Sequence, residues 1–130
     1  MSVMPRLLIV EDDPYVRKQL MLYLEDFEEF RLASAQTGEE ALQLLLEEPA
    51  DLCLVDLRMP GMNGVDFIRI AQERKLCRAC LVHTGVMDRF LEEELTSLCI
   101  EDRDIFFKPV DLELILRRAR ELAAAWRHCP

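Results

Sequence analysis

The sequence contains no long hydrophobic run. Although 51% of its 130 residues are hydrophobic, no apolar stretch approaches the roughly 20 residues that a membrane-spanning helix requires. Residues 1–6 also lack the apolar segment of a secretory signal peptide. We therefore expect a cytoplasmic protein without a membrane-spanning segment.

Basic residues are few and scattered. The chain has 16 Lys and Arg against 25 Asp and Glu, which gives a formal net charge of −9, and no basic stretch exceeds two adjacent residues. Because contacts to nucleic-acid phosphates need clustered Lys and Arg, we expect no direct binding to nucleic acid.

The cysteine pattern does not favour a metal or redox centre. The five cysteines are an odd number, and without a secretory signal we interpret them as reduced thiols. Cys77 and Cys80 have the CxxC spacing, but a structural zinc site needs four ligands and no second pair stands at zinc-ribbon spacing. Cys80 also lies in an apolar run that is typical of a buried strand.

Short apolar runs alternate with segments of helical spacing along the whole chain. The predicted strands are residues 6–10, 30–33, 52–55, 79–82 and 105–107. Helices are predicted after Asp13, after Thr37, after the loop at 60–64, from about Asp88 and after Asp111. Five strands alternating with five helices favour one α/β domain over residues 1–130, with a parallel sheet covered on both faces.

Polar side chains follow most of the predicted strands. The residues in these positions are Glu11, Asp12 and Asp13 after the first strand, Asp56 after the third, Thr84 after the fourth and Lys108 after the fifth. The carboxyl ends of parallel strands meet at one edge of the sheet, so we expect these groups to gather there. Clustered carboxylates repel one another, and a divalent cation with oxygen ligands, such as Mg²⁺, relieves this repulsion.

Such a site has the parts needed for phosphoryl transfer. A carboxylate held beside Mg²⁺ can attack a phosphoryl group and form an aspartyl phosphate. An ammonium and a hydroxyl, as on Lys108 and Thr84, can hold the phosphoryl oxygens.

Four stretches of the sequence resemble the signature regions of bacterial two-component response-regulator receiver domains. They are residues 9–14, 55–64, 83–85 and 107–110, which occur in the family's order at predicted strand ends. The resemblance covers essentially the whole chain. It implies a flavodoxin-like, three-layer sandwich with a five-stranded parallel sheet in the order 2-1-3-4-5.

The resemblance also implies the phosphoacceptor and the metal ligands. Asp56 would accept the phosphoryl group and contribute to the metal site. Asp12 would bind Mg²⁺ directly and Glu11 through water. The backbone carbonyl of Arg58 would complete the protein's share of the metal shell.

Further residues would sense the phosphoryl group. Thr84 would hydrogen-bond a phosphoryl oxygen and move inward, and Lys108 would pair with the same group. The bond between Lys108 and Pro109 is expected to be cis, as in the family. His83, next to Thr84, is expected to be a packed strand-end residue.

The sequence departs from the family at a position that matters for switching. Receivers usually carry Tyr or Phe three residues before the lysine, and here that residue is Ile105. The neighbouring Phe106 should point to the opposite face of the strand. Arg58 and Val86 flank the site at positions that vary in the family, so we expect an altered dephosphorylation rate.

The expected function is a phosphorylation-dependent switch. A histidine kinase or phosphotransfer protein would donate the phosphoryl group, and a downstream protein or output domain would bind the face formed by the helix from about Asp88, the strand at 105–107 and the last helix. The resemblance also admits a homodimer. The alternative is a degenerate receiver that binds partners independently of phosphorylation, which Ile105 favours.

Two other classes are less favoured by the residues present. Haloacid-dehalogenase-type phosphatases place a second Asp two residues after the nucleophile, where this chain has Arg58. We therefore expect a phosphoacceptor and not a turnover enzyme. A flavodoxin-type flavin site would need a phosphate-binding loop after the first strand, where three carboxylates stand.

Overall fold

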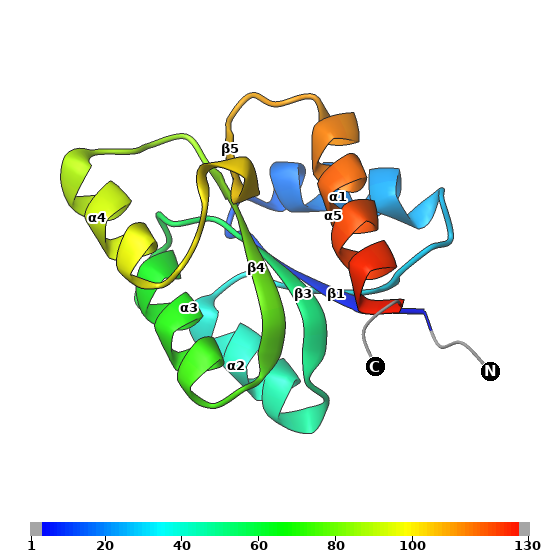
Figure 1. Ribbon diagram of the computed structural model, residues 1–130, viewed down its shortest axis with the longest axis horizontal. Coiled ribbons are helices and arrows are strands. Elements are labelled where there is room, and N and C mark those ends of the chain that lie inside the picture. The colour runs from blue at the N-terminus through cyan, green and yellow to red at the C-terminus, as the bar shows by residue number, and fades with distance from the viewer. Residues whose placement is uncertain (1–3, 128–130) are drawn as a thin grey trace.

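Five strands and five α-helices alternate along the chain, and the computed structural model describes residues 4–127 (Figure 1). The strands are β1 (Arg6–Val10), β2 (Arg31–Ala35), β3 (Ala50–Val55), β4 (Cys77–Thr84) and β5 (Ile105–Phe107). The helices are α1 (Pro14–Glu25), α2 (Gly38–Glu47), α3 (Gly64–Glu73), α4 (Arg89–Ser97) and α5 (Leu112–Arg127), and a short 3₁₀ turn, η1 (Asp102–Asp104), precedes β5.

All neighbouring strands are parallel, in the order β2-β1-β3-β4-β5. Helices α1 and α5 cover one face of the sheet, and α2, α3 and α4 cover the other (Figure 1). The central strands are buried on both faces, so their side chains alternate between two separate hydrophobic cores. This arrangement confirms the predicted three-layer, flavodoxin-like α/β fold and its strand order.

The predicted helix starts are confirmed by side-chain caps. The carboxylate of Asp13 accepts hydrogen bonds from the N–H groups of the first turn of α1, and Thr37 and Asp88 cap α2 and α4 in the same way. Asp111 accepts a bond from the Glu113 N–H at 3.0 Å, at the start of α5. Local sequence therefore determines where each of these helices begins.

Some predicted boundaries are wrong. Strand β2 lies at 31–35 and not at 30–33, and β3 and β4 are longer than their apolar runs. The longer strands include Asp51 and Arg78, because backbone pairing continues where the side chains are polar. The first helix ends at Glu25, and Phe27 beyond it is 39% exposed.

No helix within residues 4–127 is both long enough and apolar enough to cross a membrane.

Gly64 should be essential for the packing of α3 against the end of β3. A Cβ atom at this position would lie 2.4 Å from the Asp56 carbonyl oxygen and 2.6 Å from the Leu57 Cα, both of which are backbone atoms. We predict that Gly64→Ala lowers the free energy of unfolding by about 2–3 kcal/mol, since the clash cannot be relieved by a rotamer change. Urea denaturation measures this loss.

Gly85→Ala is the matched control, because a Cβ atom there meets nothing within 4 Å. It should change the free energy of unfolding by less than about 0.5 kcal/mol. Equal stability of the two variants would contradict the close packing of α3 on the loop after β3.

Candidate functional site

The sheet holds the backbone of the polar residues just beyond its strand ends. The Asp56 N–H donates to the Val10 carbonyl at 3.0 Å, and the Lys108 N–H donates to the Thr84 carbonyl at 2.8 Å. The Glu11 N–H donates to the carbonyl of Ala35, at the end of β2, at 3.0 Å. The side chains that follow β1, β3 and β5 therefore leave the sheet at the same edge.

Three carboxylates meet at this edge. Glu11, Asp12 and Asp56 each offer one oxygen, and these oxygens lie within 4.8 Å of one another. Glu11 is 2% exposed and Asp56 is 7% exposed. Two oxygens on one Mg²⁺ ion are at most about 4.2 Å apart, so small side-chain rotations would let this oxygen-only cluster bind the ion directly or through water.

Lys108 compensates part of this negative charge. Its Nζ lies 2.7 Å from Glu11 Oε1 and 3.2 Å from Asp56 Oδ2. Burial lowers the pKa of Lys108, but its hydrogen bonds and charge interactions with the two carboxylates outweigh burial, and its pKa is raised above the usual value. Lys108 therefore stays protonated, and one ammonium faces three carboxyl groups.

Glu11 is the carboxyl of this cluster whose pKa is raised most clearly by its surroundings. Burial raises the pKa of Glu11 to about 7, and repulsion from Asp56 adds to this effect, whereas the Lys108 hydrogen bond opposes it. A carboxyl with this pKa is about half protonated at neutral pH. A divalent cation bound to the cluster would displace that proton and favour the ionised form.

The turn after β3 also folds around Asp56. The Arg58 N–H donates to Asp56 Oδ1 at 3.3 Å, which keeps the turn close to the carboxylate cluster. This contact is consistent with the predicted position of the Arg58 carbonyl near the metal, but coordination by that carbonyl stays a prediction.

Comparison with known proteins agrees with this geometry. Residues 7–120 match the response regulator receiver domain. The chain belongs to this family. It is 31% identical over 133 residues to the transcriptional regulatory protein AruR of Pseudomonas aeruginosa, covering 98% of this chain and 53% of AruR. It is 35% identical over 119 residues to the response regulator protein PilR of the same organism, covering 90% of this chain and 25% of PilR.

Solved structures show the same fold. A CheY-like receiver domain from Methanospirillum hungatei superimposes with a TM-score of 0.84 at 23% identity, covering 98% of this chain and all of that one. Chemotaxis protein CheY4 of Vibrio cholerae gives a TM-score of 0.81 at 21% identity, with 92% of this chain and 99% of that chain covered. The receiver spans about half or less of the two curated relatives named above.

Thr84 of this receiver is fully buried and bonded to its own loop. Its Oγ1 donates to the Val86 carbonyl and accepts from the Val86 N–H, both at 3.3 Å. A cavity of about 190 Å³ lies next to it, between the loops that follow β3 and β4, and Arg58 is among the residues that line it. The hydroxyl therefore has space beside it for the predicted movement, although the movement itself stays a prediction.

The switch position is partly buried on the α4 side of the sheet. Ile105 pairs with Val82 across β4 and β5 and packs into the core beneath α2, α3 and α4. Phe106 packs into the other core, which confirms the prediction that it faces the opposite way. A cavity of about 420 Å³ adjoins Ile105 between β5 and α4, where a larger side chain would find room.

The structure confirms the cis bond between Lys108 and Pro109 and shows one contact that the sequence analysis missed. The Arg17 guanidinium donates to the Glu11 carbonyl at 2.8 Å and thereby holds the acidic turn after β1. The only signal in the sequence is a basic residue that follows the acidic run by one helical turn. Such spacing is common on helices, so it does not identify the contact.

Three of the cysteines lie within β3 and β4 and away from this edge. Cys53 and Cys80 are register partners on β3 and β4, and Cys77 begins β4. These three and Cys99 are free thiols, whereas Cys129 lies outside the described residues. Hydrogen bonds with Cys53 and then Cys80 lower the pKa of Cys77 to about 5. Within residues 4–127, Glu11, Asp12 and Asp56 form the one group of three potential metal ligands whose oxygen, nitrogen or sulfur atoms lie within 4.8 Å of one another.

His83 is buried, and its Nδ1 has no hydrogen-bond partner. Burial lowers the pKa of His83 to about 4, the Lys108 charge lowers it further, and the Asp56 charge opposes them. Unfolded histidine has a pKa of about 6.5. As the pH falls below 6.5, the unfolded chain binds a proton that the folded chain excludes, so His83 reduces stability in acid.

We predict that His83→Phe removes this acid penalty. Between pH 7.5 and pH 4.5 the variant should gain roughly 2–3 kcal/mol of stability relative to the unsubstituted protein, since one pKa unit corresponds to about 1.4 kcal/mol. Urea denaturation at both pH values measures the difference. Glu11 titrates in both proteins and cancels in this comparison, and a pH-independent difference would contradict a buried neutral imidazole.

Proposed function

We propose that this receiver domain is a signalling switch that accepts a phosphoryl group on Asp56 with Mg²⁺ bound beside it. The observation that carries the proposal is the meeting of Asp56 with Glu11, Asp12 and the Lys108 ammonium at one edge of the sheet. Asp56 supplies the nucleophile, and the surrounding groups supply metal ligands and a cation for the phosphoryl oxygens.

The chemical step transfers the phosphoryl group from a donor to an oxygen of Asp56. A new bond forms between this oxygen and phosphorus, while the bond between phosphorus and the donor nitrogen or oxygen breaks and its electron pair stays with the leaving group. Bound Mg²⁺ would neutralise charge on the phosphoryl oxygens. Lys108, now 3.2 Å from Asp56, is within reach of the incoming group and would transfer its hydrogen bond to it.

The site favours a phosphoacceptor over a turnover enzyme. A phosphatase that uses an aspartate nucleophile also needs an acid or base close to the leaving group, and the position two residues after Asp56 holds Arg58. Hydrolysis of the acyl phosphate would then depend on water reaching it past the side chains of Arg58 and Val86. The chain therefore acts once per phosphoryl group and does not turn over a substrate.

Partners follow from the family. Response regulators work with histidine kinases and with output domains, and we propose a histidine kinase or phosphotransfer protein as the donor for this chain. The face formed by α4, β5 and α5 is the proposed surface for a downstream partner or a second copy. The cytoplasmic location expected from the sequence stays a prediction.

Ile105, which stands where receivers usually carry an aromatic residue, favours a second candidate function. In that case the domain would bind its partner regardless of phosphorylation. Beryllofluoride, which mimics the phosphoryl group, separates the two functions. The switch predicts amide shift changes along α4 and β5 in NMR spectra, whereas a non-switching module predicts changes only around Asp56.

Acetyl phosphate should modify this receiver on Asp56. With Mg²⁺ present, intact-mass spectrometry should show one added phosphoryl group per chain, which is lost in Asp56→Asn or when the metal is chelated. Asp13→Asn is the control, because Asp13 is an exposed neighbour that caps α1 and Asn caps equally well. Labelling that persists in Asp56→Asn would contradict the proposal.

Binding of Mg²⁺ should depend on pH because the metal competes with the Glu11 proton. With a Glu11 pKa of about 7, the affinity for Mg²⁺ should rise about tenfold from pH 6 to pH 8. Titration calorimetry measures this change. Glu11→Gln cannot release a proton, so its Mg²⁺ affinity should be nearly constant over the same range, and a tenfold rise in that variant would assign the proton to another group.

A further inference from the structure

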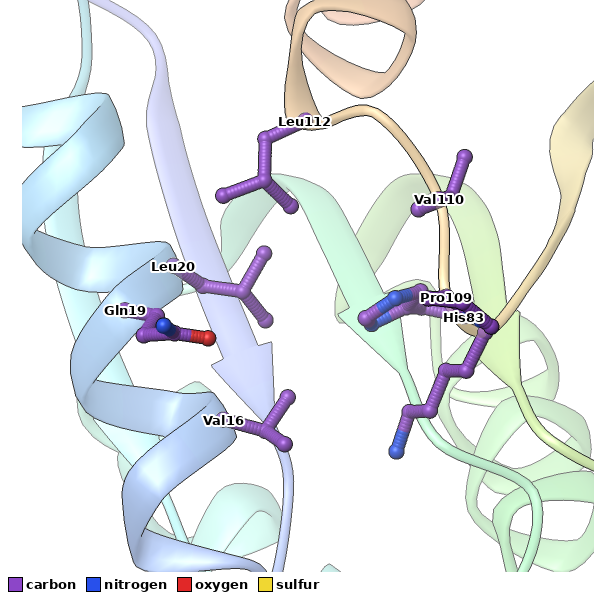
Figure 2. A pocket seen from close by; sticks show the side chains of 8 residues that line it. Val16, Gln19, Leu20, His83, Pro109, Val110 and Leu112 are labelled. Carbon is purple, nitrogen blue, oxygen red and sulfur yellow. The ribbon is translucent and has the colours of Figure 1, made fainter.

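Phe107, the last residue of β5, leaves much of a large aromatic side chain in water, since it is 53% exposed. Side chains alternate between the two faces of a strand, so Phe107 lies on the same face as Ile105, whereas Phe106 packs into the core beneath α1 and α5. The cavity drawn in Figure 2 lies beside α1, and Phe107 does not line it.

The cavity of about 420 Å³ between α4 and β5 adjoins the Phe107 ring. Phe107 and Ile105 line it from β5. Leu95 and Ile100, which also line it, are at most 8% exposed. The polar lining residues are all exposed, and they are Glu92, Thr96 and Asp102. The apolar walls are therefore the ones farther from solvent, and a ring that moved against them would remove apolar area from water.

The backbone of Phe107 is joined to the phosphorylation site on two sides. Thr84 is its register partner on β4, and the next residue, Lys108, donates its N–H to the Thr84 carbonyl at 2.8 Å. The Lys108 Nζ lies 3.2 Å from Asp56 Oδ2. Thr84 and Lys108 are the two residues proposed to bind the phosphoryl oxygens, so a displacement of either one reaches Phe107 directly.

We propose that Phe107 is the switching aromatic residue of this receiver, and that its ring lies in water before phosphorylation and enters the cavity between α4 and β5 when Asp56 is phosphorylated. Ile105 permits this movement, because an aromatic ring at its position would compete for the same space. Phosphorylation then removes an exposed aromatic side chain from the surface of α4 and β5, which gives partners two different surfaces to distinguish. This inference rests on the proposed phosphorylation of Asp56.

The test is NMR of the whole chain with Mg²⁺ and beryllofluoride as the phosphoryl mimic. Nuclear Overhauser cross-peaks between the Phe107 ring protons and the methyl groups of Leu95 and Ile100 should be weak or absent in the free protein and strong in the complex. Phe107→Leu, which lacks the ring, assigns them. A ¹⁹F spectrum of the same sample reports whether beryllofluoride is bound.

The two readouts separate the inference from the function on which it rests. A bound ¹⁹F signal without stronger cross-peaks would overturn the role of Phe107 and leave the proposed role of Asp56 untouched. The absence of a bound ¹⁹F signal would instead count against the proposed function.

Two substitutions on β5 test the seat of the ring. Ile105→Phe should fill the cavity, so that beryllofluoride still binds but the Phe107 cross-peaks do not appear. Phe107→Ala should also bind beryllofluoride, and it should lose most of the amide shift changes along α4. Phe90→Ala is the matched control, because Phe90 is a 65% exposed phenylalanine of α4 that does not line the cavity. Undiminished α4 shift changes in Phe107→Ala would overturn the proposal.

Thr96→Val tests the same seat without beryllofluoride. It exchanges a lining hydroxyl for a methyl group of similar size, so the more apolar cavity should strengthen the cross-peak from the Phe107 ring to Leu95 in the free protein. Ser97→Ala is the control, since both hydroxyls donate to a backbone carbonyl of α4 but Ser97 does not line the cavity. An unchanged cross-peak in Thr96→Val would overturn the proposal whether or not Asp56 accepts the mimic.

Discussion

The ion pair of Lys108 with Glu11 and Asp56 joins the ends of three strands, and the remaining site depends on it. It connects residues that are 97 and 52 positions apart in the chain. Placing three carboxylates together at a nearly buried edge costs solvation and adds mutual repulsion. Burial, with repulsion from Asp56 added, raises the pKa of Glu11 although the Lys108 ammonium opposes this effect. The site is therefore built to take up further positive charge, and a divalent cation is the form that suits its oxygen ligands.

The two helical layers use this edge differently. On the side of α2, α3 and α4, the Thr84 hydroxyl and Ile105 each lie beside a cavity. On the side of α1 and α5, His83 and Lys108 are among the residues that line a third cavity. Because neighbouring residues on β4 alternate between the layers, adjacent positions in the sequence serve two separate spaces.

The match to the receiver family covers residues 7–120 of this chain. This chain covers 53% of AruR and 25% of PilR. The matched region includes Glu11, Asp12, Asp56 and Lys108, the residues of the acidic edge. Ile105 stands where receivers usually carry Tyr or Phe, and Arg58 and Val86 line the cavity beside Thr84.

The sequence by itself determined the order of elements, most helix starts and the residues of the acidic edge. Hydrophobic period and side-chain caps are local properties, and the rule that parallel strands end at one edge brings Asp12, Asp56 and Lys108 together without knowledge of distances. Only the tertiary structure decided the Arg17 contact, the raised pKa of Glu11 and the unpartnered nitrogen of His83. These depend on burial and on the spacing between segments far apart in the chain, which packing sets and which no local pattern of residues records.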